Sequence, residues 1–484
     1  MLDELISGIQ CLLRSPTCFD LIGTVNNVLW GDYSVLIIVL VIAGLGFTIS
    51  LGGLQLTHFG HMFSLIRNST ESDKAGISSF QALCTSLSAR VGTGNLAGVA
   101  MAISVGGPGA VFWMWVIALL GMATGFAESL LAQVYKVKDR HQEFRGGPAY
   151  YIQQGLGSRW LAILFSICLF LGYGLFFSAM QANTITDALD NAYNVPTLYS
   201  GLAITFIAGV IVIGGLRSIA RFAAVVVPFM GLAYVLVAVG ITLINITSVP
   251  EMLGNIISSA FGLQEAGAGA LGAAIKAGIQ RGLYSNEAGS GSAPHAAAAA
   301  SPNPNHPATQ GYIQMLGVFF DTIILCTCTA VIILLAGEIP NGEMTGIRLT
   351  QDAMSHHIGS YGLHFVSMAI TLFAFSSVVA NFAYAQSNLR IFGLDTKAGN
   401  IGYTTAYLLM VFWGSGATLA QVWAAADMAL GLMTLVNITA LALLAPTIVA
   451  VSRDYTFKRK NNQPMVFHKS DCKIQGKTKP GIWE

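Results

Sequence analysis

Two short stretches combine glycine with polar residues inside sequence that is otherwise apolar enough to lie in a membrane. The first reads SARVGTGNLAG (88–98) and the second reads GLYSNEAGSGSAPH (282–295). Each glycine disfavours a helix by about 1 kcal/mol relative to alanine, so we expect the helix to break in both stretches. A broken helix exposes amide N–H groups, which suit a carboxylate, and free carbonyl groups, which suit a cation.

The first stretch offers both kinds of group. We expect Thr93, Gly94 and Asn95 to supply hydrogen-bond donors to an anion. The carbonyl groups of Ser88 and Val91, together with the side chain of Asn95, would supply acceptors to a cation.

The same glycines have two other interpretations. Because they are four residues apart, Gly94 and Gly98 could serve only close packing between helices. A dinucleotide-binding loop needs G-x-G-x-x-G after a strand, whereas here the third glycine comes one residue late and the context is helical. The G-K-[ST] of a Walker loop is missing from this stretch, so ATP is not expected as an energy source.

The composition places most of the chain in lipid. Of 484 residues, 54% are hydrophobic and only 10% are charged, against about a quarter charged in ordinary globular domains. Four of the seven cysteines lie in apolar stretches and no CxxC pair occurs, so neither a disulfide framework nor a cysteine metal centre is expected. The N-terminus, MLDELISGIQ, opens with acids, so a cleaved secretory signal is not expected.

Eleven apolar stretches are long enough to cross a hydrocarbon core of about 30 Å. They lie approximately at 33–52, 79–105, 108–133, 159–181, 197–215, 222–247, 253–292, 310–336, 361–389, 401–419 and 421–449. The distribution of lysine and arginine gives the orientation. With the N-terminus outside, nineteen of them fall in inside segments and only Arg14 and Arg348 in outside segments, while the other three lie in apolar stretches.

The two broken stretches occupy the second and the seventh of these spans. If the first span is peripheral, spans two to six and seven to eleven form two halves, and an odd number of spans in each half gives them opposite directions. Interrupted helices at corresponding positions of inverted halves indicate a midplane binding site in a secondary transporter. We therefore predict an N-terminal segment with a peripheral helix (1–52), two five-helix repeats (79–247 and 253–449) and a cytoplasmic tail (452–484).

Four longer segments resemble the signature sequences of the alanine/glycine:cation symporter family, and the resemblance extends over nearly the whole chain. They are SLSARVGTGNLAGVA (86–100), GGPGAVFWMW (106–115), FRGGPAYYIQQGLG (144–157) and SNEAGSGSAPHAAAAA (285–300). The resemblance implies cotransport of a small neutral amino acid, usually alanine or glycine, with sodium or in some members protons. It also implies an all-α, leucine-transporter-type fold of two inverted five-helix repeats, here with one extra N-terminal helix.

That fold implies a sodium site between its first and eighth core spans. The eighth core span is the ninth apolar stretch of this chain and contains FAFSSVVAN, with Ser376 and Ser377 side by side. Serines in membrane helices also commonly bond back to the preceding turn, which is the alternative interpretation. The predicted sodium ligands are Ser88, Val91, Asn95, Ser376 and Ser377.

Further residues complete the predicted substrate site. Gln181 could meet the substrate or make a packing hydrogen bond, and Phe177 could wall the site or only pack against its neighbours. Glu287 is a carboxylate within the membrane, where charge is expensive, so we expect it to pair with Arg90 or Arg281 or to contact an ammonium group. The predicted substrate-binding residues are Gly92, Thr93, Gly94, Asn95, Phe177, Gln181, Asn286, Gly289 and Ser290.

The broken spans predict a secondary transporter, and the resemblance implies that it takes up a small neutral amino acid with sodium, by alternating access in a bacterial cytoplasmic membrane. Proton coupling and transport of glutamine or serine are alternatives, and an ion channel is an alternative of a different class. No paired carboxylates, catalytic triad or metal set indicates an enzyme, and neither an organic cofactor nor a nucleic-acid partner is expected. Asp321 and Asp427 are expected at solvated helix ends, without a role.

Overall fold

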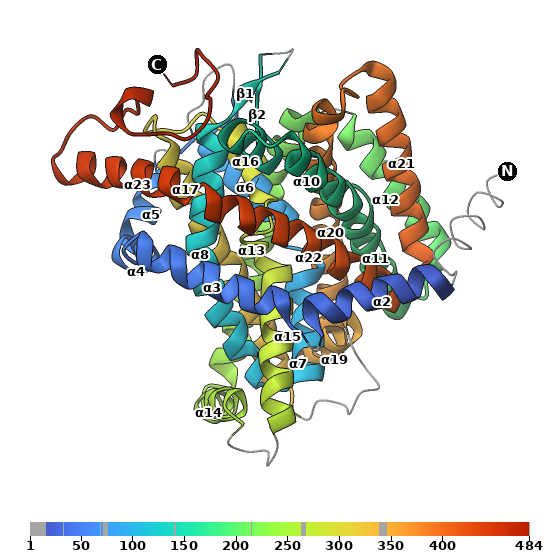
Figure 1. Cartoon of the computed structure of the whole chain (residues 1–484). Helices are drawn as coiled ribbons and strands as arrows, with labels where there is room; N and C mark the ends of the chain where they lie inside the picture. Colours follow the sequence, from blue (N-terminus) through green and yellow to red (C-terminus); the bar gives the residue numbers. More distant parts are fainter. Residues whose placement is uncertain are drawn as a thin grey trace.

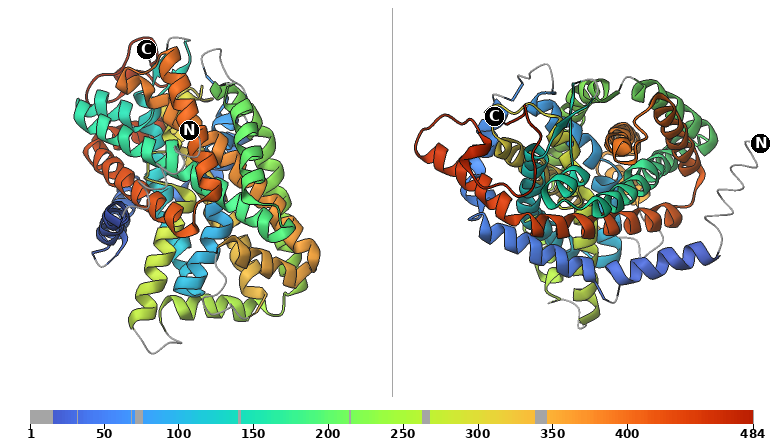
Figure 2. Two further views of the ribbon diagram at one scale, coloured as in Figure 1. Left: turned by 90° about the vertical axis from the view of Figure 1, so that its right-hand side faces the viewer. Right: turned by 45° about the horizontal axis from the view of Figure 1, so that its top comes forward.

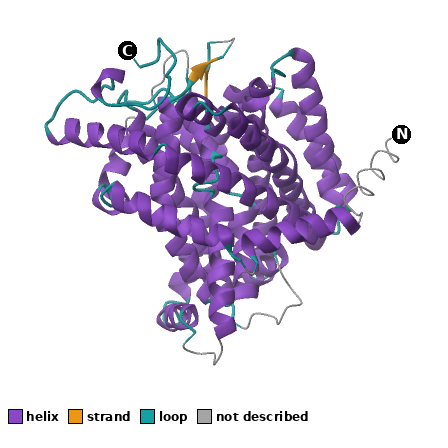
Figure 3. Ribbon diagram, in the orientation of Figure 1, coloured by secondary structure: helices purple, strands orange, loops and turns teal. Residues whose placement is uncertain are grey.

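The computed structural model describes residues 16–483 apart from 32, 68, 71–75, 140–141, 214, 263–267 and 338–345. The described chain is almost entirely helical (Figures 1 and 3). Its one sheet within these ranges pairs two short antiparallel strands, β1 (Val137–Lys138) and β2 (Phe144–Arg145). The predicted all-α class is confirmed. Arg14, which entered the charge count, lies outside the described residues.

The long helices follow the predicted spans closely, and short turns lie between several of them, π-helical in η1 to η4 and 3-10 helical in η5 and η6. In the first half of the chain they are α2 (Pro16–Trp30), α3 (Val35–Ser50), α4 (Leu54–Thr57), α5 (Phe59–Arg67), α6 (Ser79–Arg90), η1 (Gly94–Gly98), α7 (Val99–Gly106), α8 (Gly109–Val134), α9 (Pro148–Tyr151), η2 (Ile152–Leu156), α10 (Arg159–Leu171), η3 (Gly172–Phe176), α11 (Phe177–Tyr193), α12 (Thr197–Val212) and α13 (Gly215–Ile244). In the second half they are α14 (Val249–Ala260), α15 (Ala268–Asn286), α16 (Ala293–Ala299), α17 (Pro307–Val318), η4 (Phe319–Cys326), α18 (Thr327–Leu335), α19 (Ile347–Ile358), α20 (Ser360–Asn388), η5 (Leu389–Phe392), α21 (Lys397–Gly416), α22 (Leu419–Leu443), α23 (Ala445–Lys460) and η6 (Lys469–Asp471).

Within the described residues, seven helical stretches are long and apolar enough to cross a membrane. They are Leu21–Ser50, Gly109–Val134, Arg159–Tyr193, Ser218–Ile244, Pro307–Leu335, Ser360–Phe392 and Leu419–Leu443. Two shorter apolar helices, Gly94–Gly106 and Thr197–Val212, fall within further predicted spans. The second, fifth, seventh and tenth predicted spans are missing from the long set, and the second and seventh are the two that contain the breaks. The total of eleven spans stays a prediction.

The lipid-facing surface is clearest on α13. Val225, Phe229, Leu232, Leu236 and Leu243 are each 60–72% exposed and recur three, four or seven residues apart, so they form one stripe along the helix. A continuous apolar stripe of this kind would be unstable in water. The helix therefore presents one face to the protein interior and the other to hydrocarbon.

The helices α2 and α3 lie on the outside of the bundle. They run along α22, with α3 also against α8 (Figures 1 and 2). The indole Nε1 of Trp30 donates to the carbonyl oxygen of Asp427 at 3.1 Å, and Asn26 Nδ2 donates to that of Ala424 at 2.8 Å. Both helices therefore lie at the periphery of the bundle, and the predicted division of the chain into segments stays a prediction.

The C-terminal tail is packed against the bundle. After α23 it returns across the end of the bundle that carries β1 and β2 (Figure 1). Phe467 and Trp483 are 1% and 5% exposed, and Trp483 Nε1 donates to the carbonyl oxygen of Gln133 at 2.9 Å. Burial opposes ionisation of Asp454, but hydrogen bonds from His306 and Lys458 outweigh it and hold the pKa of Asp454 below its ordinary value. The tail is thus an ordered part of this surface.

Candidate functional site

The first broken helix is interrupted where the sequence predicts. Helix α6 ends at Arg90, and Val91 takes an extended conformation with φ −73° and ψ 96°. The Oδ1 atom of Asn95 accepts a hydrogen bond from the amide of Gly92 at 3.0 Å, so the side chain replaces a lost helical carbonyl. The chain becomes helical again at Thr93, passes through the π-helical turn η1 and continues as α7.

The second broken helix is interrupted over a longer segment. Helix α15 ends at Asn286, and α16 begins at Ala293. Between them Glu287, Gly289 and Gly291 have φ angles of +54°, +87° and +89°, which L-residues with side chains rarely adopt. The break predicted at 282–295 is confirmed and lies within 287–292.

The two breaks lie against each other. A Cβ atom placed on Gly94 would lie 3.2 Å from both Ser285 Cα and Tyr284 Cδ1, a separation that leaves no room for a larger side chain. The Nδ2 atom of Asn95 also donates to Ser285 Oγ at 3.1 Å. The residues of the predicted anion site are therefore next to the last turn of α15.

Gln181 meets the first break directly. Its Oε1 atom accepts hydrogen bonds from the amide of Thr93 at 2.9 Å and from the Thr93 hydroxyl at 2.7 Å. A Cβ atom on Gly92 would lie 2.7 Å from the same oxygen. Of the three residues predicted to bind an anion, Thr93 thus binds the oxygen of a neutral amide that comes from α11, whereas the amide of Asn95 donates to the Gly92 carbonyl.

The predicted cation ligands of α6 and α20 are brought together. Ser377 Oγ donates to the carbonyl oxygen of Val91 at 3.3 Å and to that of Phe373 at 3.2 Å. Ser376 Oγ donates to the Ser88 carbonyl at 3.3 Å, and Ser88 Oγ donates to the Ser376 carbonyl at 2.8 Å. Four oxygen-bearing residues from two helices therefore gather at the end of α6. The bond to Phe373 is the back-bonding that the alternative interpretation expected.

A second polar cluster surrounds Asp321, and the sequence prediction for this residue is wrong. Asp321 lies in η4 and is 0% exposed, not solvated. Its carboxylate accepts from Asn95 Nδ2 at 2.8 Å, from Ser285 Oγ at 2.6 Å and from Thr322 Oγ1 at 2.8 Å. Asn95 therefore faces this cluster with its amide nitrogen. An acid inside an apolar span was the signal that could have marked the residue.

Aromatic rings form a continuous column beside the breaks. Phe177 stacks on Tyr173 and Tyr284 with centroids 4.7 and 5.3 Å away, and Tyr284 contacts Trp423 at 5.0 Å. The guanidinium carbon of Arg281 lies 4.4 Å from the Trp423 ring centroid. Phe177 thus walls the region of the breaks as one member of a column that joins η3, α11, α15 and α22.

Asp427 closes one end of this column, and its predicted solvation is also wrong. It is buried, and its two carboxylate oxygens accept from Arg281 Nη1 at 3.1 Å and from Arg281 Nη2 at 2.8 Å. Gln280 Nε2 donates to the same carboxylate at 3.0 Å. The pairing links α15 to α22 and leaves Arg281 unavailable to Glu287.

The remaining predicted residues of the second break bond within it or to fixed neighbours. Asn286 Oδ1 accepts from the amide of Ala288 at 3.0 Å, and Ser290 Oγ donates to the carbonyl of Glu287 at 2.6 Å. The carbonyl of Gly289 accepts from Asn437 Nδ2 at 2.9 Å. The structure does not bring these side chains to the Thr93 amide.

The expected Arg90–Glu287 ion pair is not formed. The three side-chain nitrogens of Arg90 are buried and have no hydrogen-bond partner. Glu287 instead accepts from Ser292 Oγ at 2.6 Å. The Glu287 carboxylate is thus held by the loop that follows α15, in which Glu287 itself has a positive φ.

Comparison with known proteins identifies the family. A profile of the Sodium:alanine symporter family matches residues 16–469. The chain is 45% identical to the amino-acid carrier protein AlsT of Bacillus subtilis over 96% of its own length and 97% of AlsT. It is 41% identical to the probable sodium/glutamine symporter GlnT of the same organism, with 94% of each chain covered.

The fold is shared with a solved transporter. The crystal structure of MhsT in complex with L-phenylalanine superposes with a TM-score of 0.58, at 14% identity, over 79% of this chain and 93% of that one. At this identity the likeness shows the fold alone. The chain therefore belongs to the sodium:alanine symporter family, and it is an integral membrane secondary transporter of the leucine-transporter type, neither an enzyme nor an ion channel.

Proposed function

We propose that the protein couples entry of sodium ions to uptake of a small neutral amino acid, alanine or glycine, across a bacterial cytoplasmic membrane. The observation that carries this proposal is the meeting of two groups at one helix break. Carbonyl and hydroxyl oxygens of Ser88, Val91, Ser376 and Ser377 gather at this break, next to the amide and hydroxyl donors of Thr93.

The substrate carboxylate binds the donors of the first break. The amide of Thr93 lies at the N-terminal end of η1 and α7, where the helix dipole favours negative charge. Gln181 Oε1 now accepts from these donors, so the carboxylate takes the place of an amide oxygen. The close approach of Gly92 and Gly94 to their neighbours limits the site to a small substrate, and Phe177 supplies its aromatic wall.

Sodium binds the oxygens between α6 and α20. Sodium is a hard cation, like calcium and magnesium, and hard cations prefer oxygen ligands. The Ser376 and Ser377 hydroxyls make long bonds of 3.3 Å to the Ser88 and Val91 carbonyls. Ser376 Oγ also donates to the Phe373 carbonyl of its own helix at 2.8 Å, so an ion that enters between the two helices replaces only the weak bonds that join them. Entry of one positive charge through 100 mV supplies about 2.3 kcal/mol to drive uptake.

The two five-helix repeats, 79–247 and 253–449, are inverted about the breaks, with the N-terminus outside and the tail cytoplasmic. The aromatic column and the Arg281–Asp427 pair close one side of the site. Alternating access requires this side to open while the opposite side closes.

Proton coupling is the second candidate. The buried Asp321 carboxylate contacts Asn95 and Ser285, one residue from each broken helix. A carboxylate in this position could take up and release a proton as the two helices move.

Uptake by purified protein in proteoliposomes tests the proposal. Labelled alanine should accumulate when an inward sodium gradient is imposed at equal pH, and unlabelled glycine should compete better than glutamine. Accumulation driven by a pH gradient in sodium-free buffer would replace sodium with protons. If glutamine were the strongest competitor, the preferred substrate would be glutamine, the amino acid in the name of GlnT.

A further inference from the structure

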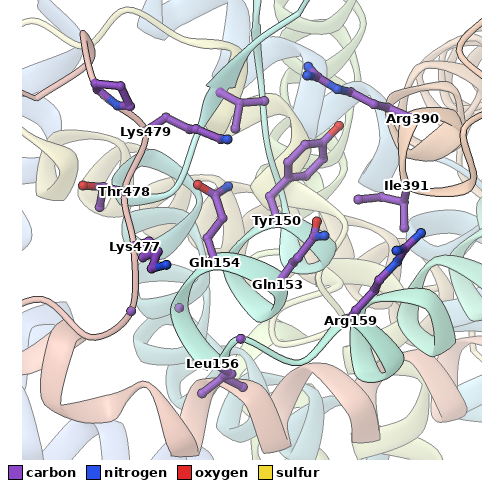
Figure 4. Close-up of a pocket in the computed structure, with 15 residues that line it drawn as sticks. Tyr150, Gln153, Gln154, Leu156, Arg159, Arg390, Ile391, Lys477, Thr478 and Lys479 are labelled. Carbon is purple, nitrogen blue, oxygen red and sulfur yellow. The ribbon is translucent and has the colours of Figure 1, made fainter.

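A large basic cavity opens at the end of the bundle that carries the C-terminal tail (Figure 4). Its volume is about 920 Å³. The turn of η2 with the first residue of α10 forms the floor, η5 forms one wall and the tail forms the opposite wall (Figure 4). Three segments that are far apart in the sequence therefore build one site.

The charge of this cavity is strongly one-sided. Arg159, Arg390, Lys477 and Lys479 line it, and none of the fifteen lining residues is acidic. The side chain of Gln153 adds an amide to the lining. Four positive charges around one cavity repel each other and give the cavity a positive electrostatic potential, which attracts anions. The cavity thus suits a ligand with at least one negative charge.

The tail is held in place on the cavity floor. The amide of Lys477 donates to the carbonyl of Gln154 at 2.9 Å, and Tyr135 Oη donates to the carbonyl of Gln475 at 2.6 Å. These bonds fix the backbone from which two of the four cations extend. On the opposite wall Arg390 Nη1 donates to the carbonyl of Lys138 at 3.2 Å.

An apolar groove of about 500 Å³ adjoins this cavity on the same two helices. On η5, Arg390 and Ile391 line the basic cavity, whereas Leu389 and Phe392 line the groove. On α10, Arg159 lines the cavity and Ile167 the groove. Eight residues of helix separate these two positions, which is about 12 Å.

The exposed residues of α10 indicate where the two cavities lie relative to the membrane. Trp160, directly after Arg159, is 82% exposed, and Leu164 and Ile167 are exposed on the next turns. Tryptophan is enriched at the membrane–water interface, with apolar residues below it. The basic cavity therefore lies at headgroup level and the groove at the level of acyl chains.

We propose that these two cavities form a binding site for an anionic phospholipid. The phosphate group lies between the four cations, and an acyl chain lies in the groove formed by α10, η5 and α21. A free phosphate ion would satisfy the cations but would leave the groove unused, which favours the lipid. Because the tail supplies Lys477 and Lys479, bound lipid also holds the tail on the bundle.

Native mass spectrometry of the delipidated full-length protein tests the headgroup site. Phosphatidylglycerol should bind more tightly than phosphatidylcholine with the same acyl chains. The double variant Arg159→Gln/Arg390→Gln should weaken phosphatidylglycerol binding by about fivefold for each arginine removed, and Arg159→Lys/Arg390→Lys should retain most of it. The control Arg459→Gln/Lys460→Gln removes the same charge from exposed positions of α23 and should bind as the wild type does.

A second variant separates lipid from free anion. A Cβ atom on Gly402, which lines the groove, would meet nothing within 4 Å, so Gly402→Trp should fill the groove without disturbing the fold. It should weaken phosphatidylglycerol binding, whereas Gly240→Trp on α13, equally free of neighbours, should not. Equal affinity for the two lipids would overturn the proposal, as would displacement of the lipid by inorganic phosphate together with no effect of Gly402→Trp.

Discussion

The first break of the molecule occupies only Val91 and Gly92, whereas the second occupies six residues, 287–292. At the first break, the Gly92 amide bonds locally to Asn95, but the Thr93 amide and the Val91 carbonyl bond to side chains from distant helices, Gln181 on α11 and Ser377 on α20. Each of these side chains can rotate away when a ligand offers a better partner.

The second break is satisfied in a more permanent way. Ser290 and Ser292 bond to Glu287 within the loop, and the amide of Gly291 donates to the buried carboxylate of Glu128 at 3.1 Å. The Nδ2 atom of Asn437 donates hydrogen bonds to both the Glu128 carboxylate and the Gly289 carbonyl. The comparison teaches that similar glycine-rich sequences serve two purposes, exchangeable binding at the first break and a fixed turn at the second.

The largest expected effect is at Gly94. Because a Cβ atom there would already lie 3.2 Å from Ser285 Cα, Gly94→Leu should force the two broken helices apart and reduce sodium-dependent alanine uptake to background. Gly98→Ala is the matched control, since its Cβ would meet its nearest neighbour, Trp423, at 3.6 Å. Normal alanine affinity in Gly94→Leu would contradict the assignment of the first break to the carboxylate.

The matching substitution at the second break should act on stability. Gly291 has φ +89°, and a Cβ atom there would lie 2.6 Å from Pro148 Cγ. Gly291→Ala should therefore lower the free energy of unfolding by about 1–3 kcal/mol, measured as a lower melting temperature in detergent. Gly240→Ala on α13 provides the control, because it meets no neighbour. Loss of alanine binding at an unchanged melting temperature would show that the two breaks do not differ in this way.

The sequence predicts the breaks well because glycine acts on the backbone locally. Gly92, Gly94, Gly289 and Gly291 weaken the helix in which they lie, whatever surrounds it. The meeting of Ser376 with Ser88 was expected only through the resemblance to a known fold. The sequence between these two serines does not indicate that they meet, because they are 288 positions apart.

The errors concern charged residues, whose environment is decided by tertiary contacts. Asp427 and Asp321 were expected at solvated helix ends. Asp427 meets Arg281, 146 positions away, and Asp321 meets the amide of Asn95, 226 positions away. Such partners belong to the packed structure, so single-sequence patterns do not reveal them.

Ser376 and Ser377 of α20 contact the first break, so their removal should affect sodium binding. In the double variant Ser376→Ala/Ser377→Ala, the sodium concentration for half-maximal uptake should rise by several-fold, because two oxygens that contact the end of α6 are lost. Alanine affinity measured at saturating sodium should change less, since excess sodium compensates for the weakened coupling. Ser290→Ala, which removes a hydroxyl from the second break, should leave sodium dependence unchanged. Wild-type sodium dependence in the double variant would refute the site.

The smallest effect is expected at Gln181, and it concerns selectivity. Its Oε1 atom accepts from both donors of Thr93, so the side chain must move or share these donors when a carboxylate binds. Gln181→Ala removes that competitor and enlarges the site by most of a side chain, which should relax the size limit and favour serine and glutamine relative to alanine.

Competition assays against labelled alanine measure this change in order, and expression is measured in parallel. Asn183→Ala is a suitable control on the same helix, because Asn183 Nδ2 donates instead to the carbonyls of Gly414 and Ala417. An unchanged order of competitors in Gln181→Ala, with a lower yield of folded protein, would make Gln181 a packing residue. In that case the donors of Thr93 would be permanently paired, and the first break would resemble the second more than its geometry indicates.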